Sequence, residues 1–184
     1  DFFFKNNKYI KLVNLGRLTD QKDQITILKA LNILKKSLNV RLLILGRGIE
    51  KKRLNSYINK NHLNKYVKIR DFIDNPFKII KQSDIFILSS KYEGLPNVLL
   101  ESLVLKKFII SSNCRTGPKE ILLNGKGGLL FKVGDYRDLS KKIIYYHKNK
   151  YKCKKLLKYS FGKLNRFNYE ENLKKYYNLV TSIN

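Results

Sequence analysis

The sequence predicts an α/β fold, a Rossmann-like, doubly wound parallel sheet of about six strands with helices at its carboxyl end. Short β-like apolar runs alternate with stretches whose apolar residues recur at helical spacing, an order typical of parallel βα units. The 184 residues, 43% of them hydrophobic, are enough for one substantial core. No internal repeat or low-complexity linker interrupts this order, so we expect a single domain over residues 1–184.

The first half of the chain contains four of the expected strands. They cover residues 9–15, 40–46, 66–72 and 84–90, and the last of them is apolar enough to be buried on both faces. Helices are expected between the strands, including a short one over residues 75–82. The apolar residues at helical spacing are Ile27, Leu31, Leu34 and Leu38 in the first helix and Leu54, Ile58 and Leu63 in the second.

The second half continues the alternation. Pro96 is expected to open a helix, because a proline in the first turn removes only a backbone donor that has no partner there. Residues 107–113 and 127–133 are the remaining expected strands, with a short helix within residues 117–123. Asp135, with Asp138 three residues later, is a capping pattern for a helix through Tyr146. The tail, residues 151–184, is expected to form basic helices.

The charge of the chain is extreme, with 39 basic and 14 acidic side chains and a formal net charge of +25. Such a charge is typical of proteins that bind nucleic acid, a lipid surface or phosphorylated ligands. The chain is also rich in Lys, Asn, Ile, Tyr and Phe and has no Trp or Met, which A/T-rich codons would produce by themselves. Total charge therefore leaves the partner open.

Several classes of protein are disfavoured by what the sequence lacks. Cys114 and Cys153 are far apart with no Cys-x-x-Cys spacing, so neither a disulfide nor a metal site is expected and a reduced, cytosolic setting fits. No apolar run reaches the roughly 18 residues of a membrane span, and residues 1–10 lack the layout of a signal peptide. Because the first residue is not Met, we expect a piece of a longer chain.

Candidate binding residues follow the first strand. In a doubly wound sheet, ligands bind at the carboxyl ends of the strands, near the point where the strand order reverses. Gly16 permits a tight turn, and Arg17 and Lys22 lie where cations can meet an anion held by backbone amides. The alternative is an ordinary turn with two solvated cations. After the second strand, Gly46-Arg47-Gly48 lacks the third glycine of a dinucleotide fingerprint and favours a tight turn.

The stretch "SSKYEGLPNVLLES" follows the fourth strand and carries two carboxylates, Glu93 and Glu101. Its helix begins near Asn97, Val98 and Leu99, whose amides and dipole favour a phosphate. Glu93 would accept hydrogen bonds from sugar hydroxyls, and Glu101 from vicinal ribose hydroxyls. The alternative is that Glu101 only complements the helix terminus and that Glu93 is an ordinary loop residue.

These motifs together resemble the carboxy-terminal, donor-binding half of family 4 retaining glycosyltransferases of the GT-B architecture. The resemblance covers residues 8–146 and is nearest to bacterial enzymes that add hexose or N-acetylhexosamine to lipid-linked glycans, capsules or lipopolysaccharide. Its motifs are Gly16-Arg17-Leu18 with Lys22, the Glu-x7-Glu segment from Glu93 to Glu101, "TGPKEIL" and "GGLLFKVGD".

The resemblance implies a role for each motif residue toward a nucleotide-diphosphate sugar, most often one linked to UDP. Arg17 and Lys22 would neutralise the departing diphosphate, Glu93 would contact the transferred sugar, and these three are the implied catalytic residues. Glu101 would bind the ribose, and the base would lie near Phe72 and Ile73. The full set of implied substrate-binding residues is Gly16, Arg17, Lys22, Phe72, Ile73, Glu93, Gly94, Leu95, Pro96, Asn97, Val98, Leu99 and Glu101.

The resemblance also implies partners and limits. No cofactor and no metal are expected, because fixed cations and helix amides neutralise the leaving group and no convincing Asp-x-Asp motif is present. The amino-terminal acceptor domain is absent, so this chain should bind donor but catalyse little. The parent enzyme would be cytoplasmic, and its basic tail would meet the missing domain or an anionic membrane on the inner face. A solvated, Lys-rich surface is the alternative for that tail.

One turn departs from the family pattern. The family usually has a small residue and then Gly-x-Pro before the fifth strand, whereas this chain has "SLVLKKFII", with Lys106 and Lys107 in the turn. Two other functions remain open. A non-catalytic nucleotide-sugar-binding or regulatory module would keep Arg17, Lys22 and Glu101 but lack turnover. A nucleic-acid-binding domain would explain the charge, but we find no DNA- or RNA-binding motif and expect no nucleic-acid partner.

Overall fold

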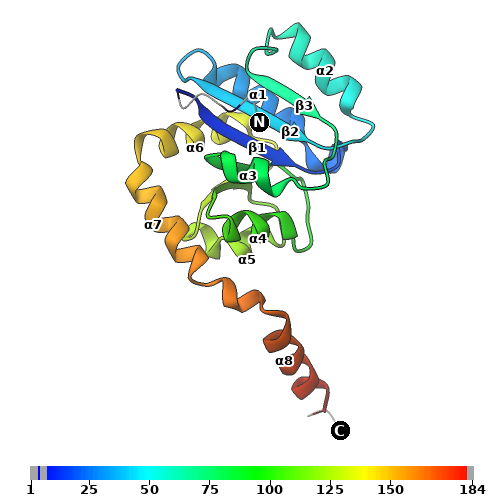
Figure 1. Cartoon of the computed structure of the whole chain (residues 1–184), viewed down its shortest axis with the longest axis vertical. Coiled ribbons are helices and arrows are strands. Elements are labelled where there is room, and N and C mark those ends of the chain that lie inside the picture. The colour runs from blue at the N-terminus through cyan, green and yellow to red at the C-terminus, as the bar shows by residue number, and fades with distance from the viewer. Residues whose placement is uncertain (1–3, 5–7, 182–184) are drawn as a thin grey trace.

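The predicted strands form one parallel sheet in the computed structural model, which describes residue 4 and residues 8–181 (Figure 1). The predicted domain limits and the end of the predicted tail, residues 182–184, lie outside the described residues. The strands are β1 (Ile10–Leu15), β2 (Val40–Leu45), β3 (Val67–Arg70), β4 (Ile85–Leu88), β5 (Phe108–Ser112) and β6 (Leu129–Phe131). Their order is β3-β2-β1-β4-β5-β6, and all neighbouring pairs are parallel. The predicted fold class is confirmed.

Helices follow the strands in the predicted alternation. They are α1 (Gln24–Leu34), α2 (Lys51–Lys60), α3 (Phe77–Gln82), α4 (Asn97–Val104), α5 (Pro118–Ile121), α6 (Tyr136–Lys148), α7 (Lys150–Phe161) and α8 (Tyr169–Thr181). Short 3₁₀ segments cover Asp20–Lys22, Leu123–Gly125 and Leu164–Phe167. The predicted cap of α6 is present, because the Asp135 carboxylate accepts hydrogen bonds from the amides of Arg137 and Asp138.

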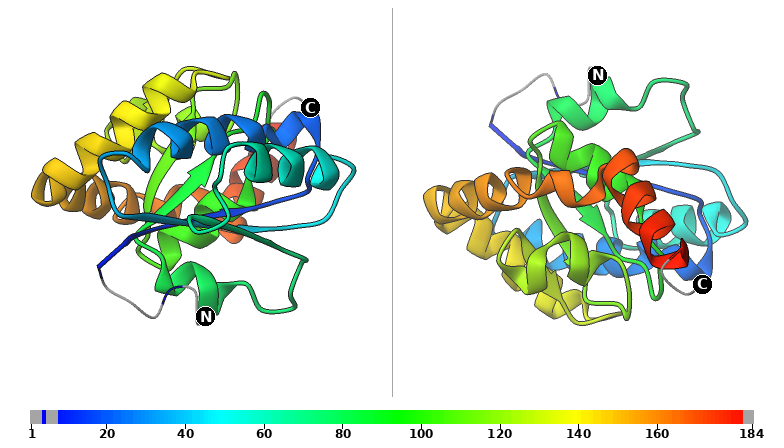
Figure 2. Two further views of the ribbon diagram at one scale, coloured as in Figure 1. Left: turned by 90° about the horizontal axis from the view of Figure 1, so that it is seen from above. Right: turned by 90° about the horizontal axis from the view of Figure 1, so that it is seen from below.

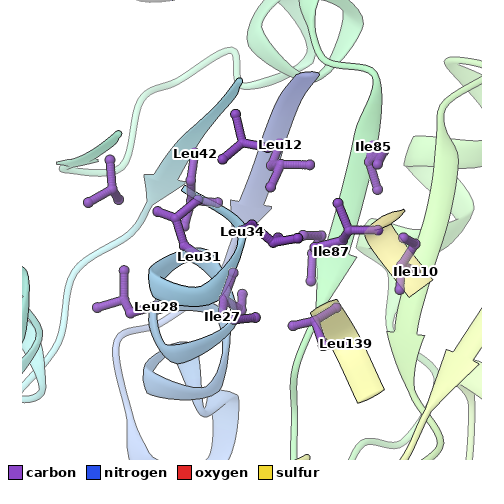
Figure 3. Packing of buried hydrophobic residues seen from close by; sticks show 14 of the residues in the cluster. Leu12, Ile27, Leu28, Leu31, Leu34, Leu42, Ile85, Ile87, Ile110 and Leu139 are labelled. Carbon is purple, nitrogen blue, oxygen red and sulfur yellow. The ribbon is translucent and has the colours of Figure 1, made fainter. Parts of the chain in front are cut away.

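The apolar residues lie on both faces of the sheet, as a doubly wound fold requires. In β4, Ile85 and Ile87 face the cluster under α1, α2 and α6, whereas Phe86 and Leu88 face the cluster under α3, α4 and α5. Figure 2 shows these helices on the two sides of the sheet, and Figure 3 shows α1 packed on the first cluster. All of β4 is buried, as predicted.

Two helices end earlier than their apolar spacing predicted. Leu38 lies beyond α1 and Leu63 beyond α2, so the prediction that they belong to helices was wrong. Both still contribute to the core: Leu63 is fully buried, and Leu38 packs against the same cluster. Apolar spacing detects which residues are buried, and it does not by itself locate the end of the helix.

The unusual turn before β5 keeps a normal helix ending despite its two lysines. Lys106 has a φ of 55°, in the left-handed region, and the amides of Lys106 and Lys107 donate to the carbonyls of Leu103 and Ser102 at 2.8 and 2.9 Å. This is the pattern of a Schellman cap, where glycine is the usual residue. A side chain there costs roughly 1–2 kcal/mol, so the departure affects local strain more than turn geometry.

The carboxyl-terminal helices leave the sheet after α6. Helix α7 passes beside β5 and α4, and α8 then projects away from the rest of the molecule (Figure 1). The prediction of helices in the tail is confirmed over the described residues. Within that part of the chain, no helix combines the length and the apolar character needed to cross a membrane.

Candidate functional site

The strand order reverses between β1 and β4, and an ion pair joins the loops that follow these two strands. Lys22 Nζ lies 2.6 Å from Glu93 Oε1, with only 17% and 8% of the two side chains exposed. The residues are 71 positions apart in the sequence, and the β1–β4 pairing brings them together. A cation and a carboxylate thus meet at the point where doubly wound sheets bind ligands.

Hydroxyl groups hold Glu93 in place. The Ser90 hydroxyl donates to Glu93 Oε1 at 2.6 Å, and the Thr116 hydroxyl donates to the Glu93 carbonyl. The Ser112 hydroxyl in turn donates to the Ser90 carbonyl at 2.6 Å. Sequence reasoning missed these three residues. Their positions were the only signal in the sequence. Ser90 lies just after β4, Ser112 is the last residue of β5, and Thr116 begins the "TGPKEIL" motif.

Further hydrogen bonds connect the same two loops. The Lys91 amide donates to the Gln21 carbonyl at 2.8 Å, and the Gln21 side chain donates to the Tyr92 carbonyl at 3.0 Å. The Ser89 hydroxyl donates to the Lys22 carbonyl at 2.7 Å. These contacts fix the loops relative to each other, so the positions of Lys22 and Glu93 are set before any ligand arrives.

Glycines let the loop after β2 pack closely against the loop after β1. A Cβ atom on Gly46 would lie 1.9 Å from the Gly16 carbonyl oxygen, and one on Gly48 would lie 2.2 Å from the Leu18 carbonyl oxygen. The Leu18 amide donates to the Arg47 carbonyl at 2.8 Å. The Gly-x-Gly sequence therefore supports the Gly16 loop through backbone contacts, in line with the predicted tight turn.

Arg17 and Thr19 offer polar groups at this edge that have no partner within the described part of the chain. The Arg17 side chain is exposed, while its backbone carbonyl accepts a hydrogen bond from Gln24 at 2.9 Å. The Thr19 hydroxyl is buried and makes no hydrogen bond. A buried hydroxyl without a partner costs free energy, which makes Thr19 a candidate ligand contact that the sequence did not reveal.

Helix α4 presents fewer open amides than its sequence predicted. It begins after Pro96, and the Leu99 amide donates to the Pro96 carbonyl at 2.9 Å. The amides of Asn97 and Val98 therefore remain as the candidates for binding a phosphate. Glu101 is partly buried one turn further on, on the helix face shared with Asn97 and Val98.

The remaining predicted site residues differ in exposure. Phe72, in the loop after β3, is 55% exposed and offers an aromatic face, whereas Ile73 packs against the core under α3. Gly94 and Leu95 are exposed and Pro96 is buried. The Gly94 carbonyl lies against Gly117, whose φ is 77° and whose hypothetical Cβ would be 2.0 Å from that oxygen. Gly117 of "TGPKEIL" thus shapes the Glu93 loop.

Asp23, at the start of α1, gives a pH-dependent prediction. Burial raises the pKa of Asp23 above its ordinary value of 3.8, against the opposing effects of the Thr26 hydroxyl and Lys91. The native state therefore binds this proton more tightly than the unfolded chain does. The contribution of the Asp23 carboxyl group to the stability of the fold is therefore complete below pH 3.8, and it is lost as pH rises through the raised pKa.

The variant Asp23→Asn carries no charge to bury, and asparagine tolerates the left-handed φ of 47° at this position. As pH rises from about 3 to about 7, we expect the free energy of unfolding of the variant to increase relative to that of the unsubstituted chain. Urea denaturation at each pH measures the difference. A constant difference across this range would contradict the burial of a charged Asp23.

Cys114 and Cys153 are both free and buried. Burial raises the pKa of Cys114 and raises that of Cys153 to about 11, so both thiols are poor nucleophiles. Over the described residues, no three His, Cys, Asp or Glu side chains are placed to share a metal ion.

Sequence relatives of the chain are glycosyltransferases. A glycosyltransferase of Methanocaldococcus jannaschii is 43% identical over 111 residues, which is 60% of this chain and 27% of the relative. The N-acetylgalactosamine-N,N'-diacetylbacillosaminyl-diphospho-undecaprenol 4-alpha-N-acetylgalactosaminyltransferase of Campylobacter jejuni is 31% identical over 122 residues, 66% of this chain and 33% of the relative. The chain therefore spans about a quarter to a third of the length of these relatives.

Solved structures share the fold. Anabaena HepE, solved in complex with UDP, superposes with a TM-score of 0.85 at 18% identity, over 95% of this chain and 49% of that chain. Staphylococcus aureus TarM, as its G117R mutant with fondaparinux, alpha-GlcNAc-glycerol and UDP, gives a TM-score of 0.82 at 20% identity, over 94% of this chain and 35% of that chain.

The family assignment depends on the sequence itself. Residues 2–163 match the sequence model of the family described as glycosyl transferases group 1, which includes both glutamates of the Glu-x7-Glu segment and the Gly16-Arg17-Leu18 motif. The predicted resemblance to GT-B, family 4-type glycosyltransferases is thereby confirmed. This chain belongs to the glycosyl transferases group 1 family.

Proposed function

We propose that this chain is the donor-binding half of a retaining glycosyltransferase that uses a UDP-linked hexose or N-acetylhexosamine. The observation that carries the proposal is the Lys22–Glu93 ion pair at the reversal of strand order, with the exposed Arg17 guanidinium in the same β1 loop. A cation beside a carboxylate is suited to a ligand that has both a diphosphate and sugar hydroxyls.

The diphosphate would be neutralised by this chain's own groups. Lys22 and Arg17 supply two positive charges, and the amides of Asn97 and Val98 stand at the positive end of α4. Such fixed donors can stabilise the negative charge that develops on the leaving group without a metal ion. We therefore propose that transfer is metal-independent.

The two glutamates would bind the two ends of the donor. Glu93, oriented by Ser90 and by the Thr116 contact to its backbone, would accept hydrogen bonds from the transferred sugar. Glu101, one turn into α4, would accept two from the ribose, and the exposed Phe72 ring would stack on the base. UDP is the favoured carrier because HepE and TarM, which share the fold, were solved with UDP.

The chemistry requires an acceptor hydroxyl that attacks the anomeric carbon from the face that the diphosphate leaves. The new C–O bond forms as the bond to the diphosphate oxygen breaks. The diphosphate departs with that electron pair and receives the acceptor proton. Configuration is retained because the new bond forms on the face from which the diphosphate departs. We propose that a glycan or lipid-linked acceptor binds an amino-terminal domain outside this chain, at the cytoplasmic membrane face, and that this chain alone turns over little donor.

Calorimetric titration of the chain with UDP, GDP and ADP tests the proposal. We expect UDP to bind most tightly, and Arg17→Ala and Glu101→Ala each to weaken its binding by about tenfold, because hydrogen bonds to charged groups contribute about 1.5–3 kcal/mol. Lys52→Ala, on the exposed face of α2, is the matched control and should leave the affinity unchanged. Equal, salt-sensitive binding of all three nucleotides that is indifferent to Glu101 would refute the proposal.

A further inference from the structure

A polar pocket lies at the opposite edge of the sheet from the proposed donor site. It has a volume of about 320 Å³ and is formed where β4 and β5 begin and where α6 passes into α7. In a parallel sheet all amino ends of the strands lie at one edge and all carboxyl ends at the other, so this pocket shares no lining with the Lys22–Glu93 site. Figure 1 shows α6 leading into α7 beside the sheet.

Lysines dominate the lining of this pocket. Lys106 and Lys107 enter from the turn before β5, and Lys150 and Lys154 from the first turns of α7. Among the described residues, Asp84 is the only carboxylate in the lining, and its Oδ2 already accepts a hydrogen bond from the Lys11 amide at 2.8 Å. The described part of the lining therefore carries four positive charges against one negative charge.

Lys107 is the most enclosed of these cations. Its Nζ donates to the Ser83 carbonyl at 3.0 Å, which is a neutral acceptor for an ammonium group that has three N–H donors. The pKa of Lys107 is lowered, mainly by burial. The neighbouring carboxylate of Asp84 opposes this effect, and the positive charges of Lys81 and Lys11 add to it. A bound anion would stabilise the charged form of a partly buried ammonium group that lies among other cations.

Tyr146 supplies a neutral donor on the same wall. Its ring packs on Phe108 with 5.0 Å between centroids, which fixes its position. Burial raises the pKa of Tyr146 to about 12, so its hydroxyl stays protonated at neutral pH and can donate a hydrogen bond. Cations together with a fixed hydroxyl are suited to the several acceptor oxygens of a phosphate.

We propose that this pocket binds a phosphate group, through Lys107, Lys150 and Lys154 with the Tyr146 hydroxyl. The proposal gives a role to Lys107, which the donor site does not use and which lies in the turn that departs from the usual family pattern, whereas the Lys106 ammonium lies over the Phe161 ring, 5.2 Å from its centroid. The phosphate could belong to a free anion or to a lipid headgroup. Both present the same oxygens to the pocket, and the experiment below distinguishes them.

The test for a free anion is an NMR titration of the ¹⁵N-labelled chain with inorganic phosphate, with sodium chloride at matched ionic strength as reference. We expect the amides of Asp84, Lys107 and Cys153 to shift along one saturating curve. The double variant Lys107→Gln/Lys150→Gln should weaken this binding at least about tenfold, because it removes two charged donors. The matched pair Lys52→Gln/Lys60→Gln on α2 removes equal charge and should change the affinity less than about twofold.

The test for a lipid source is sedimentation with phosphatidylcholine vesicles that contain phosphatidylglycerol, against pure phosphatidylcholine. If Lys107→Gln/Lys150→Gln loses more vesicle binding than Lys52→Gln/Lys60→Gln does, the phosphate is assigned to a lipid headgroup. Saturable phosphate shifts without vesicle binding would assign it to a free anion. Both variant pairs should retain the dispersed spectrum of the folded chain. If chloride reproduces the shifts, the proposal is overturned. It is also overturned if the two double variants bind phosphate and vesicles equally well.

Discussion

Replacing Lys22 with alanine is expected to lower the free energy of unfolding by about 3 kcal/mol, because it leaves the enclosed Glu93 carboxylate without its cation. Glu93 is 8% exposed, so water cannot fully replace the ammonium group at 2.6 Å. The Ser90 hydrogen bond remains but does not cancel the charge. UDP binding should fall by more than about tenfold in the same variant, because one charged contact to the diphosphate is lost.

A double-mutant cycle separates the ion pair from the other effects of the substitution. Glu93→Gln should cost less than Lys22→Ala, and the double variant should recover part of the stability that Lys22→Ala loses, since no unpaired carboxylate remains. Urea denaturation of the four proteins gives the coupling free energy. Additive losses would show that Lys22 and Glu93 stabilise the fold independently of each other.

Replacing Gly46 with alanine is expected to destabilise the chain by about 3 kcal/mol or more and to displace the loop that carries Arg17. The new Cβ would lie 1.9 Å from the Gly16 carbonyl oxygen and 3.0 Å from its carbon. Both are backbone atoms that no change of rotamer can move away. The β1 and β2 loops would have to separate, so UDP binding should fall together with stability.

Gly94→Ala is the matched control, since a Cβ atom on Gly94 meets nothing within 4 Å. Thermal unfolding should place Gly94→Ala within a few degrees of the unsubstituted chain and Gly46→Ala well below it. Equal melting temperatures for the two variants would mean that the Gly46 loop is free to move and that its glycine has another role.

Much of the fold was predictable because its signals are local. The apolar runs of β1, β2 and β4 and the cap at Asp135 are each readable within a few residues, and the structure has them where they were expected. The ends of α1 and α2 were not, because Leu38 and Leu63 continue the apolar spacing after the helix stops. Burial of those side chains comes from packing that a periodic pattern cannot distinguish from helix.

The candidate site was predictable only in part. Motif residues such as Arg17, Glu93 and Glu101 could be named from their positions after strands, but the hydroxyls that hold Glu93 could not, since serine and threonine are common at strand ends. The Leu99 amide was predicted to be open, and the Pro96 carbonyl accepts its hydrogen bond instead. That contact depends on the exact path of the chain into α4.

The sequence by itself determined the α/β class, the strand positions, the family and the residues that reach the carboxyl edge of the sheet, because each depends on short-range patterns or motifs. The tertiary structure alone decided that Lys22 pairs with Glu93, that Gly46 must be glycine, and that Lys107 and Lys150 face one pocket. Those residues are far apart in the chain, and only the parallel pairing of strands and the packing of helices brings them together.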